Sequence, residues 1–335
     1  MFLILNEEMR NLKKEIKLSD YFWINKGTDK EFEVKFLEYF EYLLNKGFND
    51  LETYVKNGFN LNEIPKVKDG DIIKEILVTS HNDFNKKKIN KKYYIYNGIC
   101  LLKTMKLIFN KDLYNCLLNI SLDFVEETYI HILRKFFIDL DQLINLYNIN
   151  ITKTNKKYSS NIGQINVQYY SVHNTLCQSL YGNCSFNSFS DIEISASIAV
   201  IRQLIELRVR RAFGLISYID KNNNTVPLNL SAIFKVLKKY KSEIKFAISI
   251  DNIELIYKWA NRYVHNGNGE LSWIPYYIEY KLRELSFGKK DKDGFNVENG
   301  IVTSEDTIKK IHDELEKKDY KIYTCKPECK IRNSK

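Results

Sequence analysis

Residues 251–267, with the sequence DNIELIYKWANRYVHNG, decide how the C-terminal half of the chain is interpreted. Asp251 can cap the first turn of a helix here, because aspartate side chains accept hydrogen bonds from the free N–H groups of that turn. Apolar residues then recur at steps of three and four, as on the buried face of a helix: Ile253, Ile256, Ala260 and Val264. Asn266 and Gly267 are residue types that end helices. The stretch therefore predicts one amphipathic helix.

A polar face lies beside this apolar stripe. Tyr257, Asn261 and His265 are spaced i, i+4 and i+8, so their polar ends can reach a common cleft. A histidine in the last turn also lies at the negative end of the helix dipole, which favours its protonated form and suits it to donate a proton or hold a phosphate. The alternative is that His265 is a packed or helix-capping residue, the commoner role of a single histidine beside an apolar stripe.

Length and composition indicate a globular protein. The chain has 335 residues, of which 44% are hydrophobic, enough for two domains or for one helical domain with a large appendage. It contains no run of about eighteen apolar residues, the length that a membrane-spanning helix needs. The N-terminal segment MFLILNEEMRNLKKE lacks the basic start and the small-residue cleavage site of a signal peptide. We therefore expect a cytoplasmic protein with no membrane partner.

Six cysteines in a chain of this length are too sparse for a secreted disulfide framework. Cys325 and Cys329 form a CxxxC pair, and no second tight pair exists. Structural zinc normally needs four ligands in closely spaced pairs. The sequence therefore predicts no metal site and no other cofactor.

The net charge of +9 favours an acidic partner, and nucleic acid is the commonest one for such a protein. The alternative is composition bias, because the chain is rich in Lys, Asn and Ile. Lysines gather at residues 86–92, directly before Tyr93, Tyr94 and Tyr96. These residues can neutralise phosphates and stack bases. A solvated loop before a half-buried edge is the favoured interpretation, because lysine runs generally mark exposed segments.

Arginines are rare in this chain, so four within ten residues are less easily explained by composition: Arg202, Arg208, Arg210 and Arg211. They are therefore candidates for contacts to a nucleic acid. Arg202, Glu206 and Arg210 also form an i, i+4, i+8 ladder, which is often only a stabilising stripe on a helix.

The N-terminal part, residues 1–150, reads as a helical domain. Helical periodicity covers residues 31–45, 51–56, 98–110 and 113–147, whereas residues 60–92 are poor in pattern. Residues 98–110 and 113–147 are expected to form two or three helices. Within residues 113–147, Glu127, His131 and Arg134 lie on adjacent faces. They form either an acid–base set or an ordinary polar helix face, and the second interpretation is favoured.

A polar linker is expected at residues 151–164, followed by a helical bundle at 165–288 and an accessory tail at 289–335. Four helices are predicted for the bundle, at residues 191–213, 231–240, 251–267 and 274–285, with a two-stranded tongue or a long loop at 216–228 and a short strand at 165–172. In the tail, Ser304 caps a short helix and KIYTCK forms a strand. The predicted fold is mainly α with a small α/β-type tail.

The helix bearing IRQLIELRVRRAFG and the later helix ending in WANRYVHNG resemble the HEPN superfamily of helical-bundle domains, over residues 190–287. Many HEPN proteins are metal-independent endoribonucleases of bacterial antiviral defence and toxin systems, whose dimers bring two histidines together around RNA. The family motif is an arginine, a polar residue, and a histidine four positions after the polar one. Asn261 and His265 match it, while Ala260 stands at the arginine position.

The resemblance implies a homodimer formed through the C-terminal bundle and an RNA-directed protein that cleaves or grips RNA without metal. Its catalytic residues are then His265, Asn261 and the displaced cation Arg262. The RNA-binding residues follow from the same face and from the arginine cluster: Lys258, Tyr257, Arg202, Arg208, Arg210 and Arg211. The second hypothesis is a non-catalytic protein-binding or regulatory module, a defence-complex subunit or a phage countermeasure, whose N-terminal helices hold a protein partner.

Overall fold

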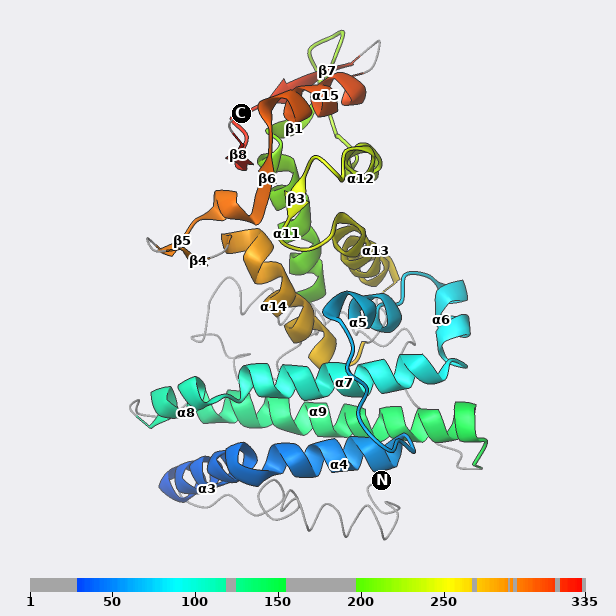
Figure 1. Cartoon of the computed structure of the whole chain (residues 1–335), viewed down its shortest axis with the longest axis vertical. Helices are drawn as coiled ribbons and strands as arrows, with labels where there is room; N and C mark the ends of the chain where they lie inside the picture. The colour runs from blue at the N-terminus through cyan, green and yellow to red at the C-terminus, as the bar shows by residue number, and fades with distance from the viewer. Residues whose placement is uncertain are drawn as a thin grey trace. The chain divides into compact units, whose positions relative to one another are not determined.

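The computed structural model of the chain describes residues 29–118, 125–154, 197–266, 270–288, 290–291, 294–316 and 320–332. The described chain is mainly α-helical, as predicted, with short strands between residues 215 and 331 (Figure 1). It divides into two compact units. Unit 1 comprises residues 1–76, 81–194 and 269–277, and unit 2 comprises residues 77–80, 195–268 and 278–335.

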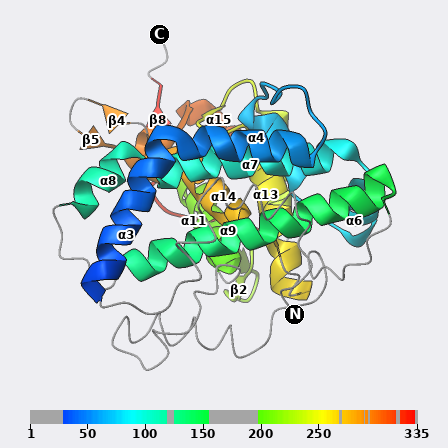
Figure 2. The same cartoon turned by 90° about the horizontal axis from the view of Figure 1, so that it is seen from below.

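The described part of unit 1 is helical throughout. Its elements are α3 (Asp29–Tyr42), the π-helical turn η1 (Leu43–Gly47), α4 (Phe48–Gly58), α5 (Asp69–Ile76), α6 (His81–Lys87), α7 (Lys91–Ile108), α8 (Lys111–Leu117), α9 (Val125–Tyr147) and the π-helical turn η2 (Asn148–Thr152). Helix α7 is central, because it packs against α4, α5 and α9 (Figures 1 and 2). Eleven of its eighteen residues are buried.

Aromatic rings and one glycine bring these helices together. The Tyr147 ring of α9 meets the rings of Phe59 and Tyr94 edge-on, with centroids 5.2 and 5.7 Å apart. Gly98 lies where α7 crosses α4, and a Cβ atom there would approach the Phe59 ring to 2.7 Å. The absence of a side chain at Gly98 therefore permits the close approach of the two helices.

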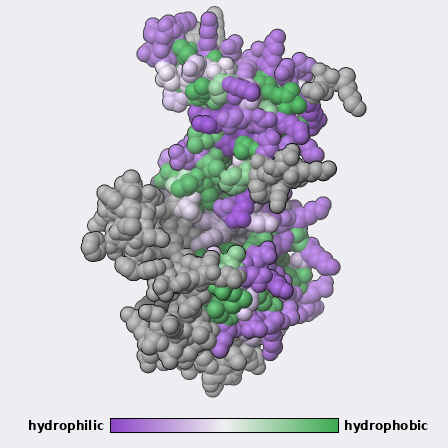
Figure 3. All heavy atoms as spheres, turned by 90° about the vertical axis from the view of Figure 1, so that its left-hand side faces the viewer, coloured by the Kyte–Doolittle hydropathy of each residue, from purple (hydrophilic) through white to green (hydrophobic). Residues whose placement is uncertain are grey.

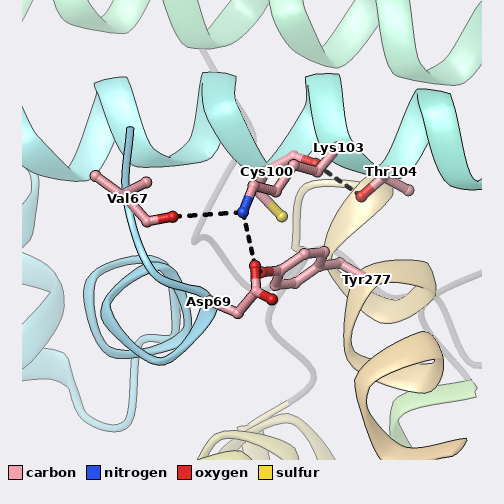
Figure 4. A network of polar contacts seen from close by, with 6 residues as sticks. All are labelled: Val67, Asp69, Cys100, Lys103, Thr104 and Tyr277. Carbon is pink, nitrogen blue, oxygen red and sulfur yellow. Dashed lines mark hydrogen bonds and ion pairs between the residues drawn. The ribbon is translucent and has the colours of Figure 1, made fainter. Parts of the chain in front are cut away.

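The first turns of α14 (Trp273–Phe287) belong to unit 1 and are held there by polar contacts. Figure 4 shows Asp69 Oδ1, at the start of α5, accepting hydrogen bonds from Lys103 Nζ at 2.7 Å and from the Tyr277 hydroxyl at 2.8 Å. The nearby Asp139 carboxylate of α9 is buried and accepts from the backbone N–H of Ser272 at 2.8 Å. Burial raises the pKa of Asp139, although Lys135 and the hydrogen bonds from Ser272 oppose the shift.

Unit 2 surrounds the pair of helices α11 (Ser197–Ala212) and α13 (Ile250–Asn266), which pack against each other. Its other elements are β1 (Leu215–Asp220), β2 (Thr225–Val226), α12 (Leu230–Lys239), β3 (Lys245–Phe246), the remainder of α14, β4 (Lys290–Asp291), β5 (Gly294–Phe295), the 3-10 turn η6 (Val297–Gly300), β6 (Ile301–Thr303), α15 (Glu305–Leu315), β7 (Tyr320–Thr324) and β8 (Lys330–Ile331). Helix α12 packs against α15.

Two small sheets join segments that are distant in sequence. In the first, β1 pairs antiparallel with both β2 and β7, and Tyr218 lies opposite Val226 on one side and Ile322 on the other. In the second, β6 pairs antiparallel with β3 and parallel with β8. The predicted tongue and the predicted KIYTCK strand are thus confirmed, as is the Ser304 cap, whose Oγ accepts from Thr307 N at 3.2 Å.

The two or three helices expected over residues 98–110 and 113–147 are α7, α8 and α9. Two other expectations about local structure were wrong. The pattern-poor residues 60–92 contain α5 and α6, which are too short to show a clear helical period. Helix α13 begins at Ile250, so Asp251 lies inside its first turn, and Ser249 Oγ accepts the hydrogen bond from Asn252 N at 3.3 Å.

The domain boundaries also fall differently from those expected. Residues 289–335 were expected to form an accessory tail; β7 in this segment pairs with β1, and residues 278–335 belong to unit 2. Of the expected linker, residues 151 and 152 end the turn η2, and residues 155–164 lie outside the described residues. The strand expected at 165–172 and the side chains of Glu127, His131 and Arg134 lie outside them as well.

The described surface is largely hydrophilic, with apolar residues in small patches on the face drawn in Figure 3. Among the helices of the described residues, we find none with the length and apolar character needed to cross a membrane.

Candidate nucleic-acid site on helices α11 and α13

The apolar face of α13 fixes which of its side chains can reach a ligand. Ile253, Ile256 and Ala260 are fully buried, as the stripe predicted, whereas Val264 at its end is exposed. Position 260 is the one at which the family motif has its arginine. Because Ala260 points into the core, no cation could be presented to solvent from this position without repacking the helix.

The polar face of α13 meets α11 at Tyr257. The Tyr257 hydroxyl donates to Glu206 Oε1 at 2.9 Å, and Arg202 Nη2 donates to the same oxygen at 3.0 Å. The Arg202 guanidinium also lies over the Tyr257 ring, 5.8 Å from its centroid. Burial, and then the hydrogen bond to Glu206, raises the pKa of Tyr257, so its hydroxyl stays protonated at neutral pH. We call Arg202, Glu206 and Tyr257 the polar triad.

Asn261 and His265 follow Tyr257 at one-turn intervals on α13. The Asn261 side chain is half-buried and the His265 side chain is exposed in the last turn of the helix. Within the described part of the chain, neither side chain has a hydrogen-bond partner. Both are therefore open to a ligand, and His265 is not the packed residue of the alternative interpretation.

The two cations nearest to His265 in sequence have other partners. Arg262 is buried, and its Nη1 donates to the backbone oxygen of Val78 at 3.2 Å. Lys258 is exposed but forms an ion pair with Glu254 at 2.8 Å. Arg262 therefore does not face solvent. Of the cations that the sequence suggested for the site, Arg202 of α11 is the one whose guanidinium lies against the polar face of α13.

Arg208 is buried in unit 2 and cross-links backbone segments there. Its three donor nitrogens reach three backbone oxygens, those of Leu285 at 2.8 Å, Val297 at 2.7 Å and Glu328 at 2.9 Å. Burial lowers the pKa of Arg208, but a guanidinium remains charged in proteins. The side chain therefore ties the end of α14, the turn η6 and the C-terminal segment together, and it has no free edge for a phosphate.

The last two arginines of the cluster differ from each other. Arg210 donates to the backbone oxygens of Ile216 at 3.3 Å and Leu228 at 2.6 Å, and so holds the connection around β1 and β2. Arg211 is exposed and forms a surface ion pair with Glu328 at 3.4 Å, an interaction that contributes little. The structure therefore brings Arg202 and Tyr257 together and places the other arginines elsewhere in unit 2.

Glu206 is the member of the site whose role the sequence did not disclose. The i, i+4 spacing indicated its pair with Arg202, but its bond to Tyr257 joins residues 51 positions apart. Among the residues that the structure describes, no three His, Cys, Asp or Glu side chains gather closely enough to hold a metal ion. The available chemistry is thus one exposed imidazole, one amide, and a guanidinium fixed by a carboxylate and a phenol.

Comparison of the chain with protein-family models, with curated proteins and with solved structures found no match.

Proposed function

We propose that the chain is an RNA-directed protein that cleaves RNA, without a metal ion, at the polar face of α13. The observation that carries the proposal is the polar triad. It places the Arg202 guanidinium against Tyr257, one and two turns before Asn261 and the exposed His265. The cation that the motif lacks at Ala260 is thereby supplied from α11.

The chemistry needs a proton-transfer group and a positive charge. In metal-free cleavage, the 2′-oxygen of RNA forms a bond to the adjacent phosphorus while the bond from phosphorus to the 5′-oxygen breaks. A proton leaves the 2′-hydroxyl and another is delivered to the 5′-oxygen. His265 carries out one of these transfers and solvent the other, while Asn261 hydrogen-bonds the phosphate. Arg202 stabilises the negative charge that develops on the phosphate oxygens.

The test is RNA cleavage by the full chain in excess chelator. Removal of a general acid or base lowers rates by about 10²- to 10⁴-fold, so His265→Ala should lose at least about 100-fold of the activity. Val264→Ala, at an exposed neighbour in the same turn, is the matched control and should retain activity. Failure of the wild type to cleave any of a broad RNA panel, or equal cleavage by His265→Ala, would overturn the proposal.

Arg202→Ala tests the source of the positive charge. Arg283 offers a matched control, because it pairs with Glu279 at i, i+4 and lies 5.3 Å from the Tyr280 ring centroid on α14. We expect Arg202→Ala to lower the cleavage rate by at least about 10-fold and Arg283→Ala to leave it unchanged. Equal effects of the two substitutions would show that Arg202 has no special role.

The second candidate, a non-catalytic protein-binding module, is favoured by a different surface of α11. Val200, Leu204 and Leu207 are spaced i, i+4, i+7 and have 62%, 36% and 51% of their surface exposed. This apolar stripe suits a second copy of the chain, in agreement with a dimer formed through the C-terminal bundle. In the described part of unit 1, the large exposed apolar side chains are the isolated Ile89 and Leu118, so the N-terminal helices offer a protein partner no comparable stripe.

Sedimentation velocity tests this second candidate. A dimer of wild-type protein that dissociates on Leu204→Lys with Leu207→Lys, and persists in Leu118→Lys, would support self-association through α11. A wild type that stays monomeric at micromolar concentrations would contradict it.

A further inference from the structure

A second basic surface lies in unit 1, at the turn between α6 and α7 (Figures 1 and 2). Residues 81–92, HNDFNKKKINKK, contain five lysines and a single acidic residue, Asp83. Four of these lysines are exposed or half-exposed and form what we call the lysine corner: Lys86, Lys88, Lys91 and Lys92.

The fifth lysine, Lys87, forms an ion pair with Asp83, the acidic residue of this segment. Lys87 Nζ lies 3.5 Å from Asp83 Oδ2 and donates to the backbone oxygen of Lys74 at 3.0 Å. Burial lowers the pKa of Lys87, as expected for a lysine with a structural role. Within the described residues, no carboxylate pairs with any side chain of the lysine corner.

The backbone that carries the lysine corner is fixed. The Tyr94 hydroxyl donates to the backbone oxygen of Lys88 at 2.7 Å and accepts from Asn150 at 2.8 Å. Asn90 caps α7, because its side-chain oxygen accepts from Lys92 N at 3.0 Å. The segment is thus a pinned helix–turn–helix and not the solvated loop that the sequence favoured. The backbone that carries the four charges is therefore ordered before a ligand binds, so binding does not have to order this part of the main chain.

The position of the lysines at a helix start adds to their field. Lys91 and Lys92 form the first turn of α7, which is eighteen residues long. The positive end of the helix dipole lies there, so two cations are unfavourable at this end unless an external anion is bound. The dipole and the four ammonium groups therefore attract the same kind of ligand.

We propose that the lysine corner binds the phosphate backbone of a nucleic acid, without reading its bases. Four cations on one corner suit a chain of regularly spaced phosphates. Base stacking is excluded for the adjacent rings of Tyr93 and Tyr94, which are buried with 4% and 1% of their surface exposed. A membrane surface is disfavoured, because Ile89 is the single large apolar side chain exposed on this corner among the described residues.

This surface goes beyond the proposed cleavage site, since it involves neither α11 nor α13. It would hold a nucleic acid whether or not His265 performs chemistry. The two proposals can therefore fail separately, because removal of the lysine corner is measured as weaker binding to nucleic acid, whereas removal of His265 is measured as slower RNA cleavage.

Equilibrium binding of the full chain to short labelled RNA and DNA duplexes, between about 50 and 200 mM salt, tests the proposal. The variant replaces all four lysines of the corner by glutamine. On a duplex, each phosphate contact contributes about 0.9 to the slope of log affinity against log salt, so the loss of four contacts should make the slope shallower by about 3.6. Because the contacts are to phosphate, the change should be the same for RNA and DNA.

A charge-matched control keeps the result specific. Four exposed lysines of unit 2 with no carboxylate partner in the described chain are replaced by glutamine in it: Lys235, Lys241, Lys245 and Lys309. The control should keep the wild-type slope. An equal change in the control, or an unchanged slope in the lysine-corner variant, would overturn the proposal. The proposal would also be overturned if the lysine-corner variant alone lost binding to vesicles rich in phosphatidylserine while its binding to nucleic acid stayed unchanged. All eight side chains lie at the surface, and circular dichroism verifies that both variants fold.

Discussion

Replacement of Arg208 by methionine should destabilise the C-terminal part of unit 2 and leave the residues of the proposed RNA site unchanged. Methionine retains the unbranched apolar stem but has no donor, so three backbone oxygens lose their partners: those of Leu285, Val297 and Glu328. A hydrogen bond from a charged donor is worth about 1.5 to 3 kcal/mol, and three such bonds at the lower limit give a loss of about 4.5 kcal/mol. Arg208→Lys retains the charge but not the planar fork, and should lose about 2 to 3 kcal/mol.

Hydrogen exchange is the appropriate assay, because it reports the opening free energy of each segment in a chain of two units. Since about 1.4 kcal/mol is tenfold, protection in β7 and β8 should fall by close to 10³-fold in Arg208→Met. The control is Arg211→Met, which removes one exposed ion pair three residues away and should change protection less than about tenfold. Unchanged protection in β7 and β8 together with weakened RNA binding would refute the reasoning, because Arg208 would then contact RNA and not carbonyl oxygens.

Three further outcomes are expected. Burial raises the folded-state pKa of Asp139, so the protonated carboxyl stabilises the fold fully below the unfolded-state pKa, and this stabilisation is lost as the pH rises through the folded-state pKa. The Tm of the wild type minus that of Asp139→Asn should therefore increase as the pH falls from about 7 to about 4. A decrease in this difference would contradict the raised pKa. Gly98→Ala should lower the free energy of unfolding by about 1 kcal/mol in urea titrations, because overpacking against Phe59 outweighs the better helix propensity of alanine; a stabilised variant would show that the two helices separate freely. Tyr277→Phe removes the bond to Asp69 and should destabilise unit 1 by about 1.5 kcal/mol, seen as faster exchange in α5, and unchanged exchange would show that Lys103 alone suffices.

Periodicity predicted the elements whose burial pattern is local. Ile253, Ile256 and Ala260 line the core as their spacing required, and Ser304 caps its helix. Helices α5 and α6 were missed because two turns contain too few residues to establish a period. The tail was misread for a different reason: β7 could be recognised as a strand, but its partner β1 lies about a hundred residues earlier, and nothing in either sequence specifies that pairing.

The candidate site shows the same limit at the level of single side chains. Spacing placed Tyr257, Asn261 and His265 on one side of α13, and the structure leaves Asn261 and His265 accessible there. It could not tell Arg202 from Arg208, which are six residues apart on one helix. Arg202 meets a phenol and a carboxylate, whereas Arg208 meets only backbone oxygens 77 to 120 residues away, and backbone oxygens leave no signature in a sequence.

Residues 269–277 bring a late part of the chain into unit 1. During synthesis, Trp273 and Tyr277 emerge only after all of α11 and α13. The contact of the Phe136 ring, which Trp273 meets edge-on, and the second hydrogen bond to Asp69, which Tyr277 adds to that from Lys103, are therefore completed only when most of unit 2 has been synthesised. Unit 2 in turn needs β7 to complete its first sheet. A recombinant fragment that stops after α9 would expose the surface of unit 1 against which the first turns of α14 pack. A fragment intended to fold as unit 1 must therefore include this part of α14.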